Sequence, residues 1–152
     1  MKKKFGFTLI FLTIMMQAQN RTEYTNLMLK SENSEVATQQ FLTKAKEDFK
    51  STKLPIFGAY IGIGNLFMAK HAGNPFSKLS YFKTGKKFLE KAVSSAPESL
   101  EIRFLRYTTQ TEMPAFLGYN KNMAEDKIFI LDHYKDSKDE VLVEQIKQFL
   151  KI

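Results

Sequence analysis

Two arginines, a tyrosine and a glutamine lie close together in a predicted helix over positions 99–113. Arg103, Arg106 and Gln110 fall within a sector of about 60° at about 100° per residue, and Tyr107 borders them. Guanidinium groups bind carboxylates through paired hydrogen bonds, and an adjacent tyrosine ring adds a flat contact surface. The pattern predicts a site for the carboxylates of a protein or peptide partner.

The same arginines have an alternative use inside the protein. A later predicted helix carries Glu125 and Asp126, which suit Arg103 and Arg106 as ion-pair partners if the two helices pack together. The sequence leaves both interpretations open, namely a groove that faces a partner and an internal set of ion pairs.

The histidines and nearby acids do not follow a metal-binding pattern. His71 and His133 are 62 positions apart, and neither belongs to an H-E-x-x-H pair. The acids that crowd near His133 are Asp132, Asp136, Asp139 and Glu140. They lack the glycine and the alternate-residue spacing of a calcium loop, so a solvated, capped helix end explains them better. We expect neither a metal nor a cofactor.

The residue types also exclude several kinds of enzyme. The chain has no cysteine, which excludes disulfides, thiolate metal sites, cysteine nucleophiles and a lipid-modified N-terminal cysteine. No Gly-x-Ser-x-Gly elbow is present, and a Ser/His/Asp triad cannot be nominated from sequence. We therefore expect a protein that is not an enzyme, and an enzyme with an unrecognised site stays as an alternative.

A glycine-containing apolar segment has three possible interpretations. Residues 54–69 carry no charge, and Gly62 and Gly64 resemble part of a nucleotide-binding loop in which Phe67 occupies the place of the third glycine. Gly58 and Gly62 form a G-x-x-x-G pattern, which lets a neighbouring helix pack closely. The segment is shorter than a membrane span, so a buried central helix is favoured over membrane insertion and over a nucleotide loop.

Lysines form a ridge on the next predicted helix. Lys83, Lys87 and Lys91 recur at every fourth position, with Lys86 beside them. Such a ridge is most often only solvated, but it also suits acidic partners or lipid headgroups. The net charge of +7 rests on 23 basic residues, of which only three are arginines, and no nucleic-acid motif is present. Nucleic acid is not expected as a partner.

The start of the chain has the pattern of an export signal. Lys2, Lys3 and Lys4 precede an uncharged apolar run over 5–16, and small Ala18 follows. We expect a signal peptide over 1–18, a polar tether over 19–33 and a single domain over 34–152, in a protein that is periplasmic or secreted. The lysine-rich start and a mature chain beginning at Gln19 resemble exported proteins of Bacteroidetes-type bacteria.

From Ser34 onwards the apolar residues recur at helical spacing. Their periodicity and the turn prolines predict about six helices and no strands. Two helix starts have the spacing of a capping box, Asn122 with Glu125 and Ser137 with Glu140. The predicted fold class is all-α.

Helix starts also repeat along the chain. Pro55 to Ser99 is 44 positions and Ser77 to Asn122 is 45, which favours a repeated helix pair. The segment from Gly85 to Pro97, with Leu89 and Ala92 between, resembles the second helix of a tetratricopeptide motif. The resemblance implies a short α-solenoid of about six helices, with the first and last as caps, that binds a protein or peptide on a concave surface.

Together these patterns predict a non-catalytic, exported helical-repeat module that binds a protein or peptide through Arg103, Arg106, Tyr107 and Gln110. A second hypothesis is a membrane-surface or lipid-associated helical protein that uses 54–69 and the lysine ridge. The sequence predicts neither the identity of the partner nor an oligomeric state.

Overall fold

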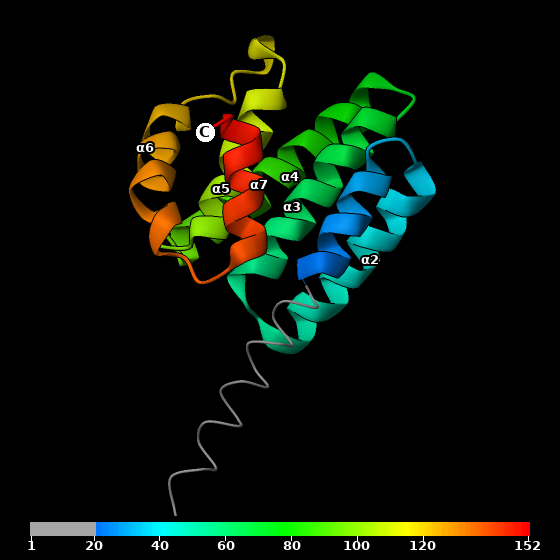
Figure 1. Ribbon diagram of the computed structural model, residues 1–152. Coiled ribbons are helices and arrows are strands. Elements are labelled where there is room, and N and C mark those ends of the chain that lie inside the picture. The colour runs from blue at the N-terminus through cyan, green and yellow to red at the C-terminus, as the bar shows by residue number, and fades with distance from the viewer. Residues whose placement is uncertain (1–20) are drawn as a thin grey trace, which may run out of the picture.

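The computed structural model describes residues 21–152, and all secondary structure in that part of the chain is helical (Figure 1). An N-terminal helix covers 21–31. The others are α2 (Glu35–Thr52), α3 (Pro55–His71), α4 (Pro75–Ser95), α5 (Leu100–Glu112), α6 (Met123–His133) and α7 (Glu140–Leu150), with short 3-10 turns η1 (Ala115–Leu117) and η2 (Tyr134–Asp136). The all-α class and the six helices expected after Ser34 are confirmed.

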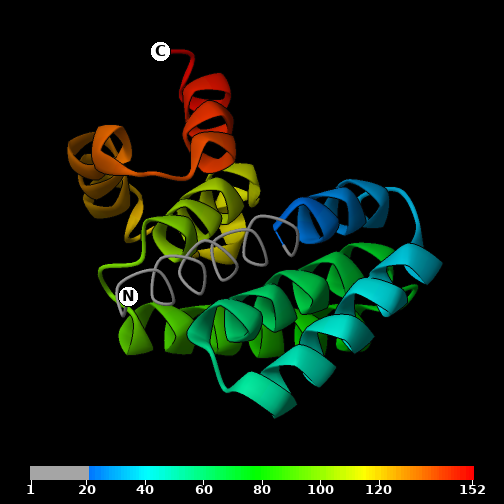
Figure 2. The same ribbon diagram turned by 60° about the horizontal axis from the view of Figure 1, so that its bottom comes forward.

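The helices form two groups that lie against each other. Figure 2 shows the N-terminal helix, α2, α3 and α4 packed together as one group, which we call the layer, with α5, α6 and α7 grouped next to it. Helix α3 lies in the middle of the layer and packs against both α2 and α4, whereas α6 packs mainly against α5. Turns of two or three residues join the helices of the first group, and longer connections that include η1 and η2 join those of the second; successive helices in each group run in opposite directions.

The uncharged segment is the central helix of the layer. Pro55 is the first residue of α3, where its fixed φ angle suits a helix start. Every residue from Phe57 to Asn65 is buried, and so is Met68. The expected buried central helix is therefore confirmed. None of the described helices combines the length and the apolar content needed to cross a bilayer.

Glycines set the distance between α3 and α4. A Cβ atom on Gly62 would lie 2.9 Å from the carbonyl oxygen of Gly85 and 2.9 Å from the amide nitrogen of Leu89. Gly58 is less constrained, because its nearest neighbour is the ring of Phe49 at 3.5 Å. The close-packing function expected of the G-x-x-x-G pattern therefore belongs to Gly62. Gly62 and Gly64 lie inside a continuous helix, so the nucleotide-loop alternative is wrong.

The expectation of a polar tether over 19–33 is wrong for the part that the structure describes. Residues 21–31 are helical, and Tyr24 is completely buried. Its ring stacks on Tyr60 of α3 at 4.1 Å, and its hydroxyl donates to Asp48 of α2 at 2.6 Å. Leu27 and Met28 also pack against the larger core, whereas Leu29 is exposed. Positions 19–20, like the expected signal peptide over 1–18, lie outside the described residues.

The capping residues agree in part with the expected ones. Asn122 makes no capping hydrogen bond, because its backbone is not extended as a cap requires. The cap of α7 is Asp139, whose carboxylate accepts from the amide of Leu142 at 3.0 Å, and not Ser137. Ser137 accepts instead from the amide of Asp139, since η2 delays the start of α7. Asn122 is therefore the N-cap residue of α6 as expected, but neither expected capping box forms.

Each helical group has its own apolar core. The larger core joins the N-terminal helix, α2, α3 and α4, and it is centred on Tyr24, Phe41, Tyr60 and Leu89. The smaller core joins α5, α6 and α7 through Phe104, Tyr107, Ile130, Tyr134, Leu142 and Ile146. Helix α5 contributes to both cores, with Ile102 and Leu105 in the larger one.

Candidate functional site

The arginine stripe predicted as a groove lies inside the molecule. Arg103, Arg106, Tyr107 and Gln110 are respectively 9%, 3%, 8% and 2% exposed. They come together on α5 as the sequence predicts, but α4 and α6 supply the ion-pair partners of the two arginines, and α7 packs on Tyr107. A peptide has little access to these side chains.

Arg106 and Arg103 are held by acids of neighbouring helices. Arg106 forms a two-bond pair with Asp126 of α6, through Nε at 2.6 Å and Nη2 at 2.8 Å. Arg103 lies 2.7 Å from Glu125 and 2.9 Å from Asp126, through Nη1 in both cases. Asp126 has no exposed surface, so its charge depends on these guanidinium groups. The internal ion pairs that the sequence left open are therefore the arrangement in the structure.

Glu90 of α4 extends this cluster and was not foreseen from the sequence. It accepts from Arg106 Nη1 at 2.9 Å and from the hydroxyl of Tyr119 at 2.6 Å. Its position as the only acid among five lysines of α4 is the signal that could have found it. Glu90 links the layer to the second group of helices.

Ion pairing, hydrogen bonding and burial shift the pKa values of three residues in and around the cluster. Burial lowers the pKa of Arg106, but Asp126 and Glu90 raise it by more, so its pKa lies above the ordinary value. Burial and the hydrogen bond to Glu90 raise the pKa of Tyr119. The hydrogen bond from Arg103 lowers the pKa of Glu125. The opposite charges of Arg106 with Asp126 and Glu90, and of Arg103 with Glu125, stabilise one another.

Tyr107 and Gln110 do not belong to the ion pairs. Tyr107 lies in the smaller core, edge-on to Phe149 with ring centroids 6.0 Å apart. Gln110 is buried with neither its Oε1 nor its Nε2 atom hydrogen-bonded to the protein. The flat contact surface expected of Tyr107 is used for packing against α7.

A second polar cluster joins the N-terminal helix to the rest of the molecule. Glu101, at the start of α5, accepts hydrogen bonds from Arg21 and from the hydroxyl of Tyr60. Arg21 Nε also lies 2.6 Å from the carboxylate of Asp139, which caps α7. Burial raises the pKa of Glu101, and Arg21 and Tyr60 partly oppose the shift. This cluster connects four helices.

The histidines occupy ordinary structural positions. His71 ends α3, and its Nε2 atom lies 2.8 Å from the carbonyl oxygen of Ser31. His133 stacks on Phe129, with its Nδ1 atom 2.8 Å from that residue's carbonyl oxygen. Within residues 21–152 no three His, Asp or Glu side chains gather in a way that could hold a metal ion.

One open hollow of about 370 Å³ lies along the outer face of α2. It is lined by Val36, Gln39, Gln40, Thr43, Lys44 and Glu47. These residues include one lysine and one glutamate but no histidine and no hydroxyl activated by a base, so the hollow offers no recognisable catalytic arrangement.

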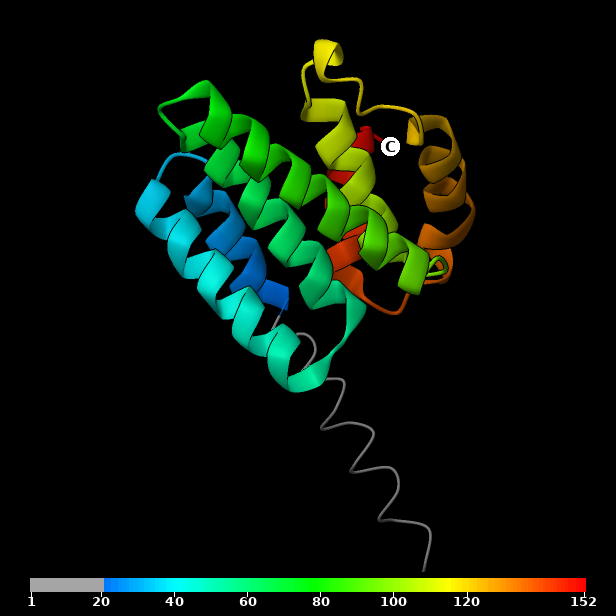
Figure 3. The ribbon, with the colours of Figure 1, turned by 180° about the vertical axis from the view of Figure 1, so that it is seen from behind.

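An open, positively charged surface lies on α4. Phe76, Leu79, Ser80, Lys83, Lys87, Lys91 and Ser94 are all exposed and occupy about a third of the helix circumference. We call this surface the basic face of α4. Figure 3 shows α4 across the front of the molecule, with no other described element over it. None of its three lysines forms an ion pair with an acid in residues 21–152.

The charge of the described chain is concentrated on this helix. Residues 21–152 contain 20 basic and 16 acidic residues, a net charge of +4. Helix α4 has five lysines and one glutamate, which is also +4, so the remaining described residues sum to zero. Because Glu90 points toward Arg106, the charge on the basic face is uncompensated. This distribution produces a positive field on one side of the molecule.

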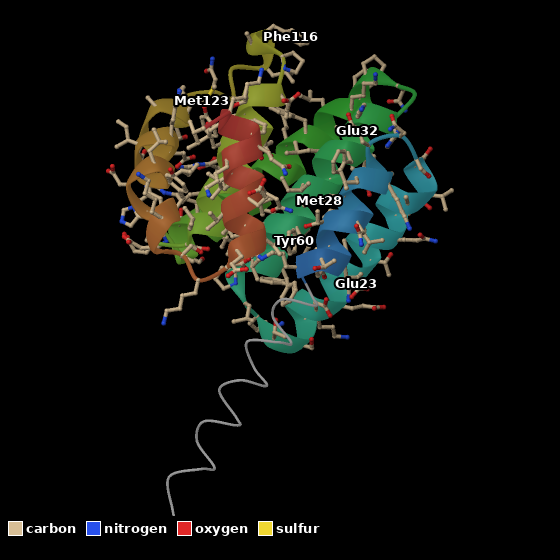
Figure 4. The ribbon with its side chains drawn as sticks, viewed as in Figure 1. Glu23, Met28, Glu32, Tyr60, Phe116 and Met123 are labelled. Atoms are coloured by element: carbon tan, nitrogen blue, oxygen red, sulfur yellow. The ribbon has the colours of Figure 1, made fainter. Side chains whose placement is uncertain are left out.

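Bulky apolar side chains are exposed at one end of the same surface. Phe76 is 86% exposed and Leu79 is 48% exposed at the start of α4. Phe116 of η1 is 87% exposed and projects from the same end of the molecule (Figures 1 and 4). Leu79 lies on a different side of α4 from the buried Leu89 and Ala92, although steps of three and four residues connect it to them in the sequence.

The chain matches no known protein-family model, no curated protein and no solved structure.

Proposed function

We propose that this protein is a non-catalytic, exported binding module whose docking surface for a protein or peptide is the basic face of α4. The observation that carries the proposal is the concentration of the net charge of residues 21–152 on one open helix. Such a surface attracts an acidic segment over a long range and aligns it on binding. The surface differs from the arginine stripe predicted by sequence, because α5 is covered.

We further propose that the helix pairs are the units of a short α-solenoid of the tetratricopeptide-like kind. The close contact of α3 with α4 at Gly62 and Gly85 supports this, since small residues allow paired helices to approach. The α5–α6 pair follows, about 45 residues later in the chain. In this arrangement α4 is the second helix of its pair.

Export is a separate part of the proposal and depends on the basic and apolar pattern of residues 1–18. A periplasmic or secreted location is compatible with the lack of cysteine, because a helical domain with two apolar cores needs no disulfides.

The binding proposal is tested with fluorescently labelled peptides of eight glutamates and of eight glutamines. We expect the purified protein to bind the glutamate peptide more tightly, with an affinity that falls as salt is added. Lys83→Glu/Lys87→Glu should abolish that preference. Lys46→Glu/Lys50→Glu, with the same spacing and charge change on α2, should leave it intact.

Two outcomes would contradict the proposal. One is equal loss of binding in both double variants, which would show only a response to net charge. The other is flotation of the protein with phosphatidylglycerol vesicles without any binding of the glutamate peptide. That result would instead support a membrane-surface function, in which exposed Phe76 and Phe116 contact lipid.

A further inference from the structure

We propose that the basic face of α4 binds a segment of a partner protein that carries a bulky apolar residue at one end and a run of acidic residues at the other. The apolar residue packs on Phe76 and Leu79, and the acids lie along Lys83, Lys87 and Lys91. This inference depends on the proposed function above and specifies the kind of partner segment.

The order of residue types along α4 is the first reason. On this face the two apolar residues come first and the three lysines follow at every fourth position. At 1.5 Å per residue, Phe76 to Lys91 covers about 22 Å, and neighbouring lysines are about 6 Å apart. An extended segment of about seven residues has that length, and its same-side residues are nearly 7 Å apart. A segregated segment can therefore contact both halves at once.

The second reason is the exposure of the apolar end. Single exposed apolar residues are common on proteins, but Phe76 and Leu79 share a face and lie directly before the lysines. Aromatic side chains that become buried on binding are among the residues that contribute most of the binding energy at protein interfaces. Lysines alone would give a salt-sensitive attraction with little selectivity, whereas an apolar contact at one end fixes the position of the bound segment.

The burial of the apolar side of α4 favours a polypeptide over a lipid surface. A helix that lies in a membrane interface exposes apolar residues along its whole length. In the middle and second half of α4 the small and apolar residues are buried instead, namely Gly85, Leu89, Ala92 and Val93. What remains exposed is apolar at one end only.

The test uses two labelled seven-residue peptides of identical composition, each with two leucines, three glutamates and two serines. In the first the leucines are at one end and the glutamates at the other; in the second they alternate. We expect the segregated peptide to bind about tenfold more tightly. Phe76→Ala/Leu79→Ala should remove this difference, whereas Ile128→Ala, an equally open position on α6, should preserve it.

The outcomes separate this inference from the proposed function. Equal affinity for both peptides, lost in Lys83→Glu/Lys87→Glu, overturns the inference and leaves the acidic-partner proposal standing. Binding of neither peptide overturns both. A tenfold difference that survives Phe76→Ala/Leu79→Ala places the apolar contact elsewhere and also overturns the inference. All substituted side chains are exposed, so folding should be unaffected, which circular dichroism can verify.

Discussion

At the residue scale, Asp126 holds two guanidinium groups inside the protein. It contacts Arg103 at 2.9 Å and Arg106 at 2.6 and 2.8 Å, and it is fully buried. A buried ion pair adds little net stability compared with apolar packing, but removal of one partner leaves a charge without compensation. The two arginines therefore have a structural role, because they join α5 to α6. How much their burial destabilises the protein depends on the acids that pair with them.

The residue-scale prediction is that Asp126→Ala lowers the free energy of unfolding by about 3–5 kcal/mol, because it leaves two buried arginines poorly paired. Glu125→Ala is the control. The side chain of Glu125 is 59% exposed and pairs only with Arg103, so its loss should cost about 1 kcal/mol or less. Urea unfolding followed by circular dichroism measures both, and similar losses in the two variants would contradict the importance given to burial.

At the element scale, the contact of α3 with α4 depends on two glycines that face each other. The Cβ position of Gly62 lies 2.9 Å from backbone atoms of α4, and that of Gly85 lies 2.8 Å from the carbonyl oxygen of Gly62. Backbone atoms cannot rotate away as a side chain can, so a methyl group at either position would push the helices apart. The position of α4, and with it the basic face, follows from this contact.

The element-scale prediction compares Gly62→Ala with Gly58→Ala on the same helix. Gly62→Ala should destabilise the protein by about 1–3 kcal/mol through overpacking against α4. Gly58→Ala meets only ordinary contacts with Phe49 and Ala92, so it should be neutral or stabilise the helix by up to about 1 kcal/mol. Urea midpoints measured side by side test this, and a stable Gly62→Ala protein would show that α3 and α4 can separate without cost.

At the scale of the whole molecule, the N-terminal helix is part of the folded unit. Tyr24 has no exposed surface and contacts α2 and α3, while Arg21 contacts Glu101 and Asp139 at the starts of α5 and α7. One short helix therefore touches elements from both groups. A protein that begins at residue 34 lacks this helix and its contacts with both groups.

The whole-molecule prediction is that a chain beginning at residue 34 is less stable than one beginning at residue 19 by at least about 3 kcal/mol, the usual cost of losing one buried aromatic side chain. Within the longer chain, Tyr24→Ala should reproduce most of the loss. Leu29→Ala, at a 66% exposed position of the same helix, should change stability by about 0.5 kcal/mol or less. Thermal unfolding measures all four proteins, and equal melting temperatures for the two chain lengths would restore the tether interpretation.

The features that follow from the sequence are those that depend on residues a few positions apart, such as the positions of the helices and the residues that share a helix face. Apolar spacing defined the helices from Ser34 onwards, and the uncharged composition of α3 indicated its central position, because a helix without a polar face must be buried. The stripe of Arg103, Arg106 and Gln110 was also correctly placed on one side of a helix. Periodicity shows which residues share a face.

What each helix face contacts depends on the tertiary packing of the helices. Arg106 meets Asp126 and Glu90, which are 20 and 16 positions away in sequence, so the stripe became an interior ion cluster and not a groove. The burial of Tyr24 was not expected from the sequence, because the short, mostly polar segment that carries it gains its stability from contacts with helices that follow it in the chain. The positive surface of α4 emerged because folding turned its one acid inward and left its lysines open to solvent. Such long-range pairings carry no local signal in a single sequence, since they arise from the packing of helices.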